Sequence, residues 1–153
     1  MKRPPHPARR PAAGTPEDPV LGAGVILWRR GLDGPEFLLL RNALHRTWGF
    51  PKGHLDADDP DPVAGALREV LEETGVRLTE EQLTAGFADV SSYRPKQRWK
   101  RVVLYLAEFP EGQELAVSSE HDRWGWFGRE QALALLEHQE LRRSLVRAAF
   151  RVG

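Results

Sequence analysis

What this 153-residue sequence lacks already narrows its possible functions. It contains no cysteine, which excludes disulfide scaffolds, thiolate zinc sites, cysteine nucleophiles and CxxC redox chemistry. It has no excess of either charge, because 22 Lys and Arg balance 22 Asp and Glu. A protein whose whole surface binds nucleic acid is therefore not expected. The longest mostly apolar run, residues 20–28, is far shorter than the ~20 residues of a membrane helix.

The N-terminal residues also lack the apolar segment of a secretory signal. Residues 1–19 hold six prolines, four Lys or Arg and two acidic residues, a composition that predicts a flexible basic tail. A single domain is expected to follow, over residues 20–153. The absence of cysteine suits a reducing compartment. We therefore expect a cytoplasmic protein with no membrane partner and no stable nucleic-acid partner, and the oligomeric state stays open.

The order of apolar patterns and turn residues predicts the fold class. Strands are expected at 20–28, 36–41, 48–50, 85–91, 99–109 and 124–127, and helices at 62–74, 129–137 and 140–150. Asp61 is a natural N-cap for the first helix, Pro62 a natural first-turn residue, and Gly75 a natural stop. Because strands and helices do not alternate regularly, the pattern favours an α+β fold with a mixed sheet and helices on each side.

The first helix carries three carboxylates on one face. Glu69, Glu72 and Glu73 are spaced i, i+3 and i+4, so they lie within about 100° of one another. Like charges at this spacing destabilise a helix, whereas a divalent cation would turn the repulsion into ligation. Carboxylates alone favour Mg²⁺ or Mn²⁺ over zinc. A solvated acidic helix face is the alternative interpretation.

The surrounding residues resemble the Nudix box, a pattern of Gly, Glu, Arg-Glu-aliphatic-x-Glu-Glu-x-Gly-aliphatic. Here it runs from Gly53 to Val76, and the part from Arg68 onward matches at every fixed position. The front half is one residue longer than the family pattern, and Asp59 stands at the place of the box glutamate. The resemblance implies that Asp59 supports Arg68, with Asp58 and Asp61 as alternatives.

The resemblance further implies the Nudix α/β/α sandwich and hydrolysis of a nucleoside diphosphate linked to another group. In that case Glu69, Glu72 and Glu73 hold metal, the Gly53 carbonyl adds a ligand, and water attacks phosphorus.

A second motif is more specific than the box. Residues 48–54 read Trp-Gly-Phe-Pro-Lys-Gly-His, which resembles the W-x-x-P-K-G-H signature of bis(5′-nucleosyl)-tetraphosphatases. That likeness implies substrate-binding roles for Lys52, Tyr93 and Lys100. It also implies that Glu120, just before a histidine, is a catalytic or metal-linked glutamate. The family's histidine before this motif is Thr47 here, and His45 lies nearby without aligning with it.

The stretch 91–101 supports a long polyphosphate substrate independently of any resemblance. It contains five Lys or Arg and no acidic residue, with Tyr93 and Trp99 among them. Basic side chains can hold phosphates and an aromatic face can stack a base. A solvated hairpin with basic tips is the alternative, as is a structural ion pair for Lys52. We assign Trp48 and Trp99 to the substrate side, and Trp28, Trp124 and Trp126 to the core.

Together these features predict a Mg²⁺-dependent hydrolase of dinucleoside polyphosphates, a small-molecule nucleotide substrate, with Glu69, Glu72, Glu73 and Glu120 as catalytic residues. Hydrolysis of diphosphoinositol polyphosphates, pyrophosphate removal from RNA 5′ ends, and a non-catalytic nucleotide sensor are the alternatives.

Overall fold

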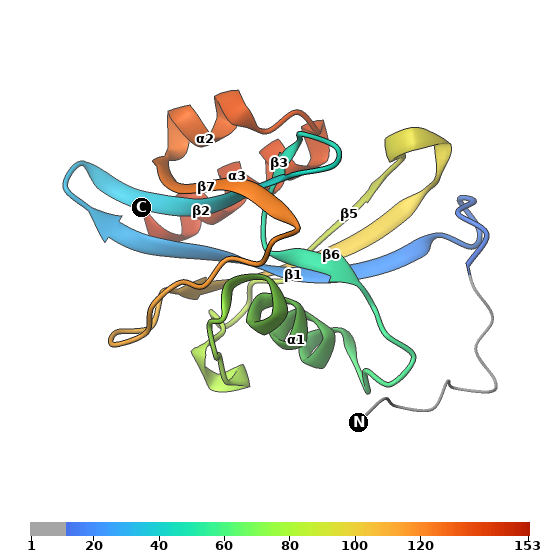
Figure 1. The fold of residues 1–153 in the computed structure, drawn as a ribbon, viewed down its shortest axis with the longest axis horizontal. Coiled ribbons are helices and arrows are strands. Elements are labelled where there is room, and N and C mark those ends of the chain that lie inside the picture. The colour runs from blue at the N-terminus through green and yellow to red at the C-terminus, as the bar shows by residue number, and fades with distance from the viewer. Residues whose placement is uncertain (1–11) are drawn as a thin grey trace.

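A seven-stranded mixed sheet forms the centre of the fold (Figure 1). The computed structural model describes residues 12–153, and the first part of the expected tail, residues 1–11, lies outside them. The strands are β1 (Val20–Gly31), β2 (Gly34–Asn42), β3 (Trp48–Gly49), β4 (Lys52–His54), β5 (Asp89–Tyr93), β6 (Lys100–Glu108) and β7 (His121–Gly128). Their order is β3-β2-β1-β6-β5, with β4 paired to β1 and β7 paired to β2. β1 and β6 are parallel, whereas β1 with β2 and β5 with β6 are antiparallel.

Helices cover both faces of this sheet (Figure 1). They are α1 (Pro62–Thr74) on one face, and α2 (Arg129–Leu135) and α3 (Gln139–Val152) on the other. Because successive side chains of a strand point to opposite faces, Val25 and Leu27 join the core under α1, whereas Ile26 joins the core under α3. The expected α+β sandwich, with a central mixed sheet between helices, is confirmed. Within the described residues, no helix is long and apolar enough to cross a membrane.

Helix α1 begins and ends where the sequence predicts. The Asp61 side chain accepts a hydrogen bond from the Ala64 N–H at 2.8 Å, and Pro62 is the first helical residue. Gly75 follows the last turn with φ of 73°, a left-handed conformation that glycine adopts without strain. These local signals fix how far α1 extends, and therefore where its carboxylates lie.

Residues 48–54 cross between two parts of the sheet. β1 pairs with β2 over residues 28–31 and with β4 over residues 22–24, whereas β3 pairs with the far end of β2. The segment therefore places Trp48 beside β2 and Gly53 beside β1.

Several elements differ from the expectations. β4 was expected to be loop, β5 lies at 89–93 instead of 85–91, and β7 begins at His121 instead of 124. Two short 3-10 helices, η1 (Glu80–Gln82) and η2 (Pro95–Gln97), were not predicted.

In the second part of the expected tail, the Gly14 carbonyl accepts from the Trp99 N–H at 2.8 Å, and the Ala12 carbonyl accepts from Arg98 at 2.9 Å. The assignment of Trp124 to the core is wrong, because it is 48% exposed on the outer strand β7.

Candidate active site

The Arg68 side chain joins the loop before α1 to two of the expected metal ligands. Its Nε and Nη2 donate to the two oxygens of Asp59 at 3.0 and 2.9 Å. Its Nη1 donates to Glu69 at 2.9 Å and to Glu72 at 3.1 Å. The hydrogen bonds to Asp59 raise the pKa of Arg68, and burial opposes part of this rise. Asp59 therefore reaches Arg68 in spite of its shorter side chain, while Asp61 is engaged as the N-cap of α1.

Glu69 lies directly against the backbone of Gly53. A Cβ placed on residue 53 would lie 2.2 Å from Glu69 Oε2, so only glycine leaves room for this carboxylate. Burial raises the pKa of Glu69 to about 7, with further increases from Glu73 and Glu72 and an opposing effect of Arg68. A cluster of desolvated carboxylates of this kind is stabilised by a bound cation.

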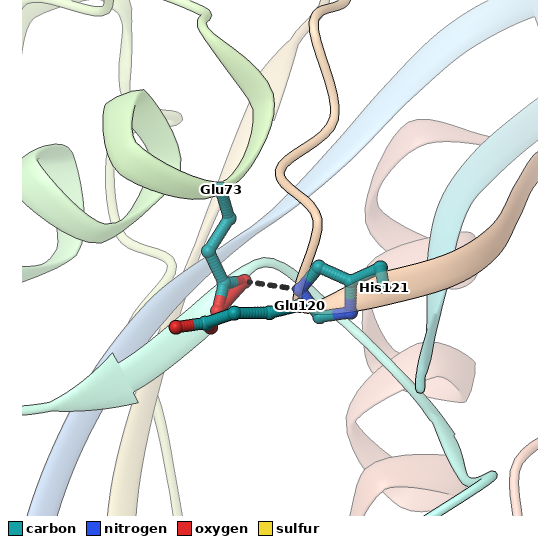
Figure 2. Close-up of side chains that lie close together, drawn as sticks. All are labelled: Glu73, Glu120 and His121. Carbon is teal, nitrogen blue, oxygen red and sulfur yellow. Dashed lines mark ion pairs between the residues drawn. The ribbon is translucent and has the colours of Figure 1, made fainter. Parts of the chain in front are cut away.

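Glu73 faces away from Arg68, toward the start of β7. It is 7% exposed, and its Oε2 accepts from the Lys52 backbone N–H at 3.2 Å. The same oxygen lies 3.5 Å from Nε2 of His121. Figure 2 shows Glu73, Glu120 and His121 converging, and one ligand atom from each lies within 4.8 Å of the others.

The residues expected to hold metal line a single cavity of about 480 Å³. Its lining includes Gly53, Glu69, Glu72, Glu73 and Glu120. Carboxylate and carbonyl oxygens are the donors that Mg²⁺ and Mn²⁺ prefer. The donor set and the fit of Glu69 against Gly53 are therefore suited to a divalent cation.

A second cavity of about 540 Å³ is basic and aromatic. Its lining includes Lys52, Lys96, Arg98, Lys100, Trp48, Phe50, Tyr93 and His138. Three of the five basic residues of 91–101 thus face it. Of the other two, Arg94 hydrogen bonds to Gln97, and Arg101 is exposed and neighbours Lys100 on β6, so its side chain points to the opposite face. Within the described residues, the Lys52 ammonium has no ion-pair partner.

Burial, together with the crowding of cations, lowers the pKa of two groups that line the second cavity. Burial lowers the pKa of Lys100, and Lys52, Arg98 and Lys96 lower it further. Burial also lowers the pKa of His54, with Lys100, Lys52 and Arg98 adding to the effect. A bound polyanion would relieve this repulsion, just as a cation would relieve that of the carboxylates.

The two cavities adjoin one another. Seven residues line both of them: Val20, Asn42, His45, Lys52, His54, Glu73 and Lys100. A ligand with a phosphate chain can therefore reach the carboxylates and the basic residues at the same time.

Two of the three aromatic residues expected to bind substrate line the second cavity. Trp48 lines the second cavity and packs edge-on against Phe127, while Tyr93 is nearly buried with its ring 5.2 Å from that of His138. Trp99 lines neither of these cavities. No sequence motif points to His138, because it lies in the α2–α3 connection and reaches the cavity only through helix packing.

Comparison with known proteins agrees with this geometry. The NUDIX domain profile matches residues 18–149. The chain belongs to the Nudix hydrolase family.

This Nudix hydrolase has relatives of nearly its own length. The asymmetrical bis(5′-nucleosyl)-tetraphosphatase of Mus musculus is 35% identical over 131 residues, 80% of this chain and 88% of the mouse protein. The enzyme of the same name from Caenorhabditis elegans is 33% identical over 125 residues, 80% of this chain and 88% of that protein. The crystal structure of a C. elegans Ap4A hydrolase binary complex superposes with a TM-score of 0.76 and 32% identity, over 88% of this chain and 98% of the other.

Proposed function

We propose that this Nudix hydrolase cleaves dinucleoside polyphosphates, converting diadenosine tetraphosphate to ATP and AMP with Mg²⁺, or alternatively Mn²⁺, as cofactor. The observation that carries the proposal is that the carboxylate cavity adjoins the basic, aromatic cavity and shares lining residues with it. A dinucleoside polyphosphate has the matching parts, a chain of negative charges with a base at its end. The names of the relatives support the same substrate class.

Each group of residues has a role in this proposal. Glu69, Glu72, Glu73 and the Gly53 carbonyl hold the cation, and Glu120 serves as an additional ligand or as the base for the attacking water. Lys52 and Lys100 hold phosphates, because they line both cavities. Lys96 and Arg98 extend the basic lining away from the carboxylates, toward Trp48 and Tyr93.

The proposed reaction is attack of water on phosphorus, with the remaining polyphosphate as the leaving group. When bound, the metal supplies charge neutralisation and lowers the pKa of its water. The protein orients the carboxylates through Arg68, whose guanidinium fixes Glu69 and Glu72. Lysines on the polyphosphate offset charge that develops on the leaving group.

A substrate panel tests the proposal. Purified protein with Mg²⁺ is given dinucleoside polyphosphates, triphosphorylated and capped RNA, and diphosphoinositol polyphosphates, and products are identified by chromatography. We expect kcat/KM for diadenosine tetraphosphate to exceed that of every other class by at least about tenfold, or ~1.4 kcal/mol of transition-state binding.

Glu73→Gln serves as the control, since it removes the charge of a proposed ligand at nearly constant volume. We expect this variant to lose most turnover while keeping the circular dichroism of the parent protein. Faster turnover of RNA or inositol substrates would reject the proposed substrate, and full activity of Glu73→Gln would reject the proposed ligand.

A further inference from the structure

His121 lines the second cavity beside Glu73, which lines both cavities, and the proposed function assigns it no role. Its side chain is 8% exposed, and neither ring nitrogen has a hydrogen-bond partner among the described residues. A buried polar group without a partner costs free energy, so such groups are rare in folded proteins. A bound ligand would supply the partner that the ring nitrogens of His121 lack.

The distance between His121 and Glu73 excludes a simple hydrogen bond as that explanation. Nε2 lies 3.5 Å from Glu73 Oε2, beyond the 2.7–3.2 Å of ordinary N–H···O hydrogen bonds. Glu73 Oε2 already accepts from the Lys52 backbone N–H. The spacing instead suits two atoms that bind one ion from adjacent positions, since ligands about 2.1 Å from a metal lie roughly 3 to 4.2 Å apart.

Glu120 completes a third position around the same point. Ligand atoms of Glu73, Glu120 and His121 all lie within 4.8 Å of one another (Figure 2). The backbone that carries them is fixed, because Ser118 N–H donates to the Glu73 carbonyl at 2.9 Å and Ala43 N–H donates to the Glu120 carbonyl at 2.8 Å.

We propose that Glu73, Glu120 and His121 form a cation site in which His121 is a direct ligand, and that this site takes a divalent transition metal in preference to Mg²⁺. Imidazole is a good ligand for iron, nickel, copper and zinc, whereas Mg²⁺ favours oxygen donors. Glu73 and Glu120 also have roles in the proposed function, so the two sites share two side chains. The role of this ion in catalysis rests on the proposed function, but its binding does not.

Pulsed electron paramagnetic resonance of bound Mn²⁺ tests the site without substrate. The full chain is stripped of metal with a chelator and loaded with substoichiometric Mn²⁺. We expect ¹⁴N modulation from a directly bound imidazole in the parent protein and its loss in His121→Gln. Titration of free Mn²⁺ should show at least about a tenfold loss of affinity in that variant, while Mg²⁺ affinity changes much less.

His138→Gln is the matched control, because it removes another partly buried imidazole from the adjoining cavity and should keep the ¹⁴N signal. If His121→Gln does not fold, retention of the signal in single Gln variants of the other four histidines assigns it to His121. Absence of ¹⁴N modulation in the parent protein, or unchanged Mn²⁺ affinity in folded His121→Gln, would overturn the proposal. A nitrogen signal in a protein that does not cleave dinucleoside polyphosphates would support this site while rejecting the proposed function.

Discussion

Single side chains in this site have properties set by where the fold buries them. Glu69 is pressed against Gly53 and has a pKa of about 7, while Glu72, one turn along α1, is largely exposed. His138 lies beside Tyr93 in a cavity lined by cations. The acid–base behaviour of Glu69 and His138 therefore depends on their burial, and the pH dependence of stability measures it.

We predict that His138 makes the folded protein less stable in mild acid. Burial lowers its pKa below the ordinary 6.5, helped by Lys52 and Lys100 and opposed by Glu137 and Glu140. Below pH ~6.5 the unfolded chain binds a proton that the folded chain does not. The free energy of unfolding therefore falls as pH falls, and His138→Gln should lose less of it between pH 7.5 and 5.5.

Urea unfolding of both proteins, in chelator, measures this difference. Between pH 7.5 and 8.5 the histidine is neutral in both states, so the two proteins should show parallel behaviour there. Parallel losses at pH 5.5 would show that His138 does not carry the effect.

At the scale of elements, the loop before α1 and the helix itself form one unit through Arg68. Asp59 is 6% exposed at its side chain and pairs with both Nε and Nη2 of Arg68. It also accepts from the Asp56 backbone N–H at 2.7 Å. The loop and α1 are thereby held together beside the proposed carboxylate ligands.

Asp59→Ala should destabilise this unit. Loss of hydrogen bonds to a charged group that is mostly buried costs about 2 kcal/mol, and Arg68 keeps only its bonds to Glu69, Glu72 and the His54 carbonyl. Chemical denaturation measures the change, with Asp33→Ala at the exposed tip of the β1–β2 hairpin as control. Equal stability of the two variants would contradict a supporting role for Asp59.

The elements also show which parts of the structure sequence reasoning can reach. Helix α1 was predicted residue for residue, because Asp61, Pro62 and Gly75 are local signals. Strand β4 was missed because its three residues carry no strand pattern and pair with β1, about 30 residues earlier in the chain. Strand β5 was predicted to begin at residue 85 instead of 89, because its position is set by pairing with β6.

The same distinction holds in the site. Glu69, Glu72 and Glu73 were proposed from helical spacing, and Gly53 and Glu120 from resemblance to a family, and all five line one cavity. His138 was missed, and the contact of His121 with Glu73 was not foreseen, because only tertiary packing brings residues 73 and 121 together. The exposure of Trp124 was also not predicted, because it depends on the place of β7 at the margin of the sheet, where β2 is its pairing partner among the described strands.

At the scale of the whole molecule, the zero net charge includes two regions of opposite charge. Residues 53–73 hold seven acidic residues and one arginine, while residues 91–101 hold five basic residues and no acid. The fold brings members of both regions to the two adjoining cavities. This pairing suits a substrate that must bind metal cations and protein cations along one chain of phosphates.

Hydrolysis of diadenosine tetraphosphate in H₂¹⁸O tests the central claim most directly. Mass spectrometry of the products shows both which bond is cleaved and where the water oxygen goes. We predict equal amounts of ATP and AMP, with a single ¹⁸O from solvent in only one of the two nucleotides. Formation of ADP alone, transfer without ¹⁸O, or no reaction with Mg²⁺ or Mn²⁺ would contradict asymmetric cleavage by water at this site.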